Sequence, residues 1–210
     1  VTAEEASRLK PYMTLAQQLG SFAGQVTETG IKAVTIEYDG HVAALNTRAL
    51  TGVVLQGLLA PLLETVNIIN APLIAKERNI AVSEVTHDRA GDYQTLIRLT
   101  VTTEAQSRTV AGTLFADNRP RIVQVKGIKL EAELVKYMLY VTNEDKPGLI
   151  GALGSVLGDN GVNVATFHLG RADAGGDAIA LIGVDQPIDE TVLTAVRALP
   201  HVGQAQALNF

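Results

Sequence analysis

The residues best suited to binding chemistry lie between Asn143 and Gly148, where a predicted strand leads into a predicted helix. Pro147 fixes its φ near the value that begins a helix, and Gly148 lets the backbone approach a ligand closely. The N–H groups of Leu149 and Ile150 then point outward from the first helical turn, where the helix dipole favours an anion. This segment therefore predicts a site for a small anion such as a carboxylate.

Asp145 gives the predicted site a mixed charge. A carboxylate beside an anion site disfavours a phosphate, but it can pair with the ammonium group of a zwitterion. The alternative is that Asp145 only caps the helix. Asn163, at the start of the next predicted strand, could bond to either end of an amino acid, or it could be a simple turn residue. The residues alone leave these alternatives open.

The glycines around the same helix do not form the G-x-G-x-x-G fingerprint of dinucleotide-binding proteins. Their three- and four-residue spacing places them on one helix face, which favours close packing of that face on a sheet or on a neighbouring molecule. They are Gly148, Gly151, Gly154, Gly158 and Gly161.

The sequence assembles no catalytic motif. Its four histidines lie in different predicted elements, and HExxH, GxSxG and GxxxxGK[ST] are all absent. The lack of cysteine excludes a disulfide framework, a thiolate nucleophile and a Cys-ligated metal. We therefore expect no catalytic residue, no metal and no cofactor in this chain.

Composition indicates a folded protein of 210 residues, with 47% hydrophobic and 19% charged residues, arranged in one or two domains. A net charge of −5 and an aromatic fraction of 4% argue against a nucleic-acid partner. The longest uncharged run, residues 49–63, is shorter than the ~20 apolar residues of a spanning helix. We expect a cytoplasmic protein without a membrane partner. Because the chain begins with Val1, we expect it to be a fragment of a longer protein.

Hydrophobic periodicity in the first part predicts a helix, a strand and a mixture of further helices and strands. Thr2 and Glu5 could form a capping box before the first helix. The predicted helices are 4–25, 47–63 and 71–78; the predicted strands are 33–38, a short partner at 42–44 across an Asp39-Gly40 turn, 66–70, 80–86, 93–103, 108–115, 122–125 and 128–133.

The second part predicts the order β-α-β-β-α-β, with two helices covering one face of an antiparallel sheet. Its strands are predicted at 137–142, 162–170, 178–184 and 202–208, and its helices at 149–157 and 189–199. We place the boundary near residues 133–136, which gives domains 1–134 and 135–210.

The segment 143–148, followed by Gly161-Val162-Asn163, resembles the ACT domain, a small regulatory module that usually binds amino acids. The first domain resembles the intervening domain of long-form D-3-phosphoglycerate dehydrogenase. That resemblance is carried by residues 15–20, 65–72, 75–78 and 117–123.

The resemblance implies an α+β protein: an intervening α/β domain with a mixed sheet, then a ferredoxin-like βαββαβ ACT domain. The parent enzyme would oxidise 3-phosphoglycerate with NAD in serine synthesis, using domains that precede this sequence. L-serine would bind as feedback inhibitor where two ACT domains pair, in a homodimer or homotetramer. Asp145 would then bind the ligand's ammonium group, and Asn163 of the partner would hydrogen-bond the ligand. Asn143 matches a position that contacts the ligand in relatives.

The family also suggests an anion site in the intervening domain, because Arg119, Arg121, Lys126 and Lys129 lie close together in the sequence. The alternative is a solvated hairpin whose charges protect a sheet edge, so we expect at most weak anion binding. Two further functions stay open: a non-catalytic regulatory part of an L-serine dehydratase, and a free-standing amino-acid sensor.

Overall fold

The computed structural model describes residues 3–89 and 91–210, which form two compact units divided after Lys126. The predicted boundary lies after residue 134. The residues between these two positions form strand β6 (Ile128–Ala132) and the segment that leads to strand β7. Thr2, and with it the predicted capping box, lies outside the described residues.

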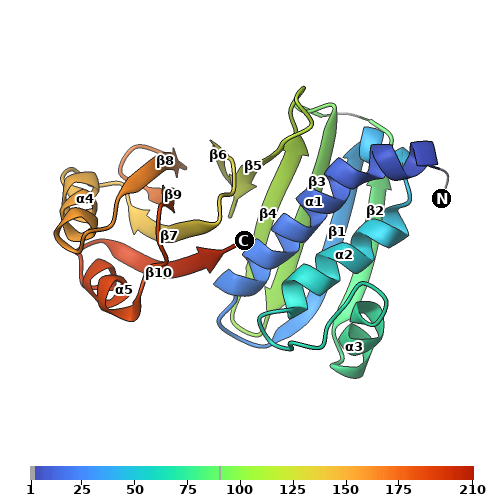
Figure 1. Cartoon of the computed structure of the whole chain (residues 1–210), viewed down its shortest axis with the longest axis horizontal. Coiled ribbons are helices and arrows are strands. Elements are labelled where there is room, and N and C mark those ends of the chain that lie inside the picture. The colour runs from blue at the N-terminus through green and yellow to red at the C-terminus, as the bar shows by residue number, and fades with distance from the viewer. Residues whose placement is uncertain (1–2, 90) are drawn as a thin grey trace. The chain divides into compact units, whose positions relative to one another are not determined.

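The first unit packs helices on a mixed sheet with the strand order β2-β1-β3-β4-β5. Helices α1 and α2 cross one face of this sheet (Figure 1). Within the described part of this unit, β1 pairs with β2 in parallel, whereas the β1–β3, β3–β4 and β4–β5 pairs are antiparallel. The elements are α1 (Ala3–Val26), β1 (Ile31–Gly40), the 3₁₀ helix η1 (His41–Ala44), α2 (Thr47–Leu59), α3 (Ala71–Glu77), β2 (Ala81–His87), β3 (Thr95–Thr103), β4 (Ser107–Leu114) and β5 (Pro120–Val125).

Helices α1 and α2 approach each other so closely that glycine is required at the contact. A Cβ atom at Gly20 would lie 2.2 Å from the carbonyl oxygen of Val54, and one at Gly57 would lie 2.7 Å from that of Gln17. Beneath the helices, Tyr38 is fully buried, and its hydroxyl lies 2.7 Å from that of Thr51. The core of the first unit is therefore fixed by backbone approach as well as by apolar side chains.

Two predicted strands of this unit were wrong. Residues 42–44 belong to the 3₁₀ helix η1, because β1 already has β2 and β3 as neighbours and leaves no place for a hairpin partner. Residues 66–70 form turns, because Asn67 Oδ1 accepts hydrogen bonds from the N–H groups of Ile69 and Asn70, at 2.9 and 3.0 Å. Such local bonds compete with strand pairing.

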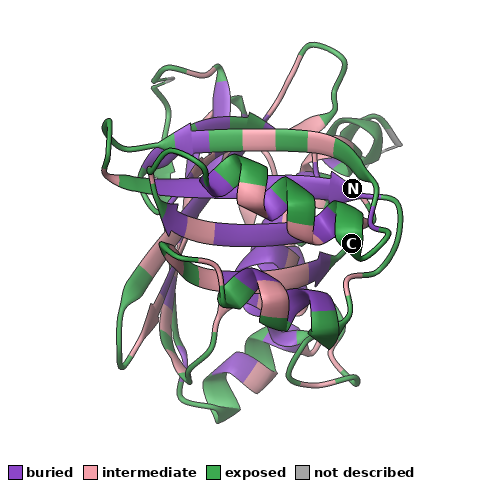
Figure 2. Ribbon diagram, turned by 90° about the vertical axis from the view of Figure 1, so that its left-hand side faces the viewer, coloured by how far each residue is buried: buried purple, intermediate pink, exposed green. Residues whose placement is uncertain are grey.

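The second unit has the predicted ferredoxin-like order, and its sheet runs β10-β7-β9-β8 with every pair antiparallel. Figure 2 shows its central strands almost wholly buried and the outer faces of its helices exposed. Leu153, Leu157, Val192 and Val196 are among the side chains that the two helices bury in its core. After β6, the elements are β7 (Tyr137–Glu144), α4 (Leu149–Asp159), β8 (Val164–Arg171), β9 (Asp177–Val184), α5 (Glu190–Arg197) and β10 (Val202–Asn209).

Candidate ligand-binding site

The turn between β7 and α4 has the backbone that the sequence predicts. Gly148 adopts φ 91°, in the left-handed region that favours glycine, and α4 begins at Leu149. No side chain caps this helix, so the alternative in which Asp145 is the cap was wrong. Leu149 is buried, whereas Ile150, Pro147 and Gly148 are exposed.

Asp145 is bound instead by the turn between β8 and β9. Its Oδ2 atom accepts a hydrogen bond from Nη1 of Arg171 at 2.8 Å and one from the backbone N–H of Gly175 at 3.2 Å. Its own backbone N–H donates to the carbonyl oxygen of Gly176 at 2.8 Å. The loop before α4 and the β8–β9 turn are therefore joined through one residue.

This arrangement keeps the Asp145 carboxylate ionised. The Arg171 hydrogen bond, followed by that of Gly175, lowers the pKa of Asp145 below its ordinary value. The side chain is 26% exposed. Its other oxygen, Oδ1, accepts no hydrogen bond from the described part of the chain, so it can accept one from a ligand.

Asn143 is buried in β7, where it pairs in register with Ala178 of β9 and Val202 of β10. Its Nδ2 group donates to the carbonyl oxygen of Glu144 at 2.9 Å. The side chain of Glu144 lies 3.3 Å from Nδ1 of His201. Asn143 therefore supports the end of the strand that leads to Asp145.

Asn163 lies just before β8 rather than inside it, and it is exposed. Its Nδ2 group donates to Oδ2 of Asp185 at 2.6 Å, and the Asp185 N–H donates to the Asn163 carbonyl oxygen at 3.4 Å. Asp185 thereby fixes the direction of the amide and leaves its oxygen able to accept a ligand donor.

A single chain does not bring Asp145 and Asn163 to one small ligand. Glu144, which precedes Asp145, pairs with Asp177 at one end of β9, and Val164, which follows Asn163, pairs with Val184 at the other end. With a strand rise of about 3.3 Å per residue, these ends are about 23 Å apart. A site using both residues needs two copies of the domain.

The second unit also presents an exposed apolar edge. Among the described strands, β8 lies at the end of its sheet and pairs with β9 alone. Its residues Val164, Phe167 and Leu169 are 37%, 37% and 42% exposed. The glycines of α4 were expected to allow close packing on a sheet or on a neighbouring molecule. The expectation that these glycines pack α4 on the chain's own sheet was wrong, because a Cβ at Gly151, Gly154 or Gly158 would meet no described atom within 4 Å.

The basic residues near β5 are not all free to bind an anion. Arg119 and Arg121 each lie within 4 Å of the carboxylate of Asp117, at 3.8 and 3.9 Å, and Arg121 stacks over the ring of Phe115 at 5.2 Å. Lys126 has a positive φ in the turn that ends the first unit. Lys129 belongs to β6 in the second unit. The predicted anion site stays a prediction.

Comparison with known proteins gives a family for each unit. The model of the D-3-phosphoglycerate dehydrogenase intervening domain matches residues 8–126, and the model of the ACT domain matches residues 137–201. The chain belongs to the D-3-phosphoglycerate dehydrogenase intervening-domain family. An ACT domain follows its intervening domain, as the resemblance implied.

Full-length relatives of this family match the whole chain. D-3-phosphoglycerate dehydrogenase of Bacillus subtilis is 32% identical over 100% of this chain and 40% of its own length. The enzyme of the same name from Methanocaldococcus jannaschii is 31% identical, with the same two coverages, and that of Synechocystis is 32% identical over 38% of its own length. The chain thus spans about two fifths of the curated relatives that it matches.

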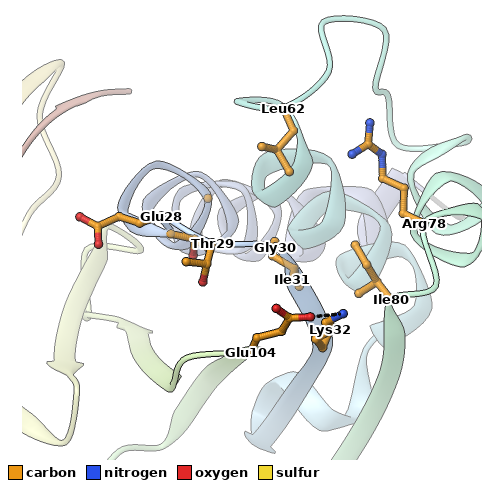
Figure 3. Close-up of a pocket in the computed structure, with 11 residues that line it drawn as sticks. Glu28, Thr29, Gly30, Ile31, Lys32, Leu62, Arg78, Ile80 and Glu104 are labelled. Carbon is orange, nitrogen blue, oxygen red and sulfur yellow. Dashed lines mark ion pairs between the residues drawn. The ribbon is translucent and has the colours of Figure 1, made fainter.

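The intervening domain carries a pocket that the sequence did not predict, because its lining comes from separate segments (Figure 3). The pocket, of about 540 Å³, lies where α1 leads into β1 and includes Leu62, Arg78 and Ile80. Lys32 and Glu104 pair at 2.7 Å in its wall. The lining contains two basic residues, Lys32 and Arg78, and two acidic residues, Glu28 and Glu104, so it has no excess charge to select an anion.

Two side chains at the ACT site were also missed: Arg171 and Asp185. Each pairs with a predicted ligand residue that lies more than twenty positions away in the sequence, and neither stands in a recognisable motif. Over residues 3–89 and 91–210, no three acidic or histidine side chains form a group that could hold a metal ion. None of the described helices is long and apolar enough to cross a membrane.

Proposed function

We propose that this chain is the regulatory C-terminal region of an NAD-dependent D-3-phosphoglycerate dehydrogenase, and that its paired ACT domains bind L-serine as feedback inhibitor. The observation that carries the proposal is the ionised Asp145 carboxylate, held through Oδ2 with Oδ1 open, beside the N-terminus of α4. Asp145 would accept the ammonium group of serine. The first N–H groups of α4, at Leu149 and Ile150, would bind its carboxylate.

Self-association completes the site. Antiparallel pairing of β8 with β8 of a second copy would cover the exposed apolar edge and continue the sheet. It would also bring Asn163 of the partner subunit to the end of β8 that carries Arg171, because antiparallel strands place opposite ends side by side. Within one chain, the two ends of β9 beside Asp145 and Asn163 are about seven strand residues, or about 23 Å, apart, which supports this arrangement.

The oxidation of 3-phosphoglycerate and the binding of NAD belong to parts of the parent enzyme outside this chain. Serine would act on them by favouring one arrangement of the paired ACT domains, a population shift whose size is set by the difference in serine affinity between the two arrangements. A cytoplasmic location is part of the same proposal.

Thermal unfolding of the 210-residue chain with L-serine tests this function, with D-serine and glycine as controls. Serine at 100 times its Kd should stabilise the chain by about 2.7 kcal/mol, which corresponds to a Tm increase of about 5–10 °C. Asp145→Ala should lose the increase. If no amino acid shifts the Tm of a sample shown to be dimeric, the proposal is wrong and the region serves assembly alone.

A further inference from the structure

Arg171 occupies the same Asp145 carboxylate that would bind the ligand. The guanidinium extends from the last residue of β8 and donates from Nη1 to Oδ2 at 2.8 Å. Its side chain is 57% exposed. This ion pair can affect ligand binding in two opposite ways. The guanidinium either competes with the ligand ammonium for the carboxylate, or it holds the carboxylate in the position that binds the ammonium.

The hydrogen bonds of Asp145 favour the second effect, in which Arg171 holds the carboxylate in place for the ligand. Both Arg171 and the Gly175 N–H bind the same oxygen, Oδ2, and no described residue donates a hydrogen bond to Oδ1. A carboxylate has about four acceptor positions on its two oxygens. An ammonium group at Oδ1 therefore does not need to displace the guanidinium.

The surrounding turn is built to hold this geometry. Asp145 N–H donates to the Gly176 carbonyl oxygen at 2.8 Å. The Gly176 N–H donates to the Asp173 carbonyl oxygen at 3.0 Å, and the Ala172 N–H donates to the Asp177 carbonyl oxygen at 2.9 Å. Gly175 has φ 76°, which lets its N–H turn toward the carboxylate. Backbone bonds thus fix the position from which Gly175 and Arg171 bind Oδ2.

We infer that Arg171 is a positioning residue for ligand recognition: together with the Gly175 N–H it fixes the Asp145 carboxylate through Oδ2, so that Oδ1 accepts the ammonium group of the amino acid. This inference rests on the proposed function. A side chain fixed before binding loses less conformational entropy when the ligand binds, which raises affinity without a new ligand contact.

Isothermal titration of the 210-residue chain with L-serine tests the sign of this effect. Arg171→Gln should raise the Kd by about three- to tenfold, since a charge-assisted hydrogen bond is lost. Arg171→Lys should recover part of the affinity. The matched control is Lys32→Gln, which removes the cation of an equally short, exposed ion pair in the other unit and should leave the Kd unchanged.

A pH series separates positioning from a general loss of structure. Lowering the pH from about 7 to about 4 should weaken serine binding more in Arg171→Gln than in the natural chain, because Asp145 then protonates nearer its ordinary pKa. Lys146 on the same loop, Glu144 on β7 with His201 beside it, and Asp173 and Asp177 beyond the turn are the other titratable groups near Asp145, and they are the same in both chains.

An unchanged Kd in Arg171→Gln overturns the inference, and a lower Kd overturns it and indicates that the guanidinium competes with the ligand. If that variant does not fold, Arg171→Lys decides by the same criterion, a Kd at or below the natural value. Asp145→Ala distinguishes the two levels of the account. Retained serine binding in Asp145→Ala contradicts the proposed function itself, whereas its loss there with normal binding in Arg171→Gln contradicts only the inference.

Discussion

Asp145 and Asn163 lie at opposite ends of strand β9: the residue before Asp145 pairs with Asp177, and the residue after Asn163 pairs with Val184. Each side chain is fixed by a different acidic or basic neighbour, Arg171 for Asp145 and Asp185 for Asn163. One domain thus carries two separate half-sites, one at Asp145 and one at Asn163. Their separation is explained if the Asp145 half-site of one copy meets the Asn163 half-site of a second copy. In such a two-fold pair, every chain contributes both halves.

Asn163→Ala should weaken L-serine binding by about tenfold or more, because the amide would bond the ligand bound at Asp145 of the partner subunit. The Tm without serine should change little, since Asn163 is exposed. Isothermal titration measures the effect. Asn160→Ala serves as control, because the Asn160 side chain is also exposed and, among the described residues, bonds only the Val156 carbonyl oxygen. Normal serine affinity in Asn163→Ala would remove this residue from the site.

Serine binding should persist into weakly acidic solution. The folded-state pKa of Asp145 lies below its ordinary value of 3.8, so its carboxylate contributes to binding and stability above that value, and the contribution is lost as the pH falls through the lowered pKa. The Tm increase caused by serine should therefore be nearly constant from about pH 7 to about pH 4. A loss of the increase centred near neutral pH would contradict the assignment of Asp145 as the ammonium partner.

Phe167→Lys should weaken self-association of the chain, because it places a charge on the apolar β8 edge that a second copy would cover. Analytical ultracentrifugation over a range of concentrations would show a larger monomer fraction. Leu73→Lys is the matched control, since Leu73 is 56% exposed on α3 of the other unit. An unchanged monomer fraction in Phe167→Lys would exclude β8 pairing as the dimer contact.

Gly20→Ala should destabilise the first unit by about 1–3 kcal/mol or more, because its Cβ would overlap the Val54 carbonyl and force α1 away from α2. Urea unfolding measures the change. Gly154→Ala is the comparison: its Cβ meets nothing within 4 Å, and alanine favours the helix by about 0.5–1 kcal/mol. Equal effects of the two substitutions would contradict this account of the helix contact.

The βαββαβ order of the second unit could be predicted because its core residues repeat at helical and strand spacing. Leu149, Leu153 and Leu157 recur every four residues and are buried in α4. In the first unit, residues 66–70 form a short, strand-like run with three β-branched residues, yet the side chains of Asn67 and Asn70 accept hydrogen bonds from backbone N–H groups of the same segment. Side-chain bonds of this kind are not visible in a hydrophobic pattern.

The turn that carries the candidate ligand residues could be predicted from sequence because Asp145, Pro147 and Gly148 are neighbours in one segment whose backbone they determine. The side chains that hold Asp145 and Asn163 in place could not be predicted in this way. Arg171 reaches Asp145, and Asp185 reaches Asn163, only after the strands pair. The register of those strands depends on the whole core rather than on local residues.

The most direct test of an L-serine site shared between two chains mixes two damaged variants. As homodimers, Asp145→Ala and Asn163→Ala should each bind serine so weakly that no site fills at a serine concentration that saturates the natural dimer. After dissociation and random re-pairing, half of the dimers contain one chain of each kind, and each of these has one intact site, so titration should recover about a quarter of the natural binding capacity. No recovery, in a mixture shown to have exchanged subunits, would contradict the shared site.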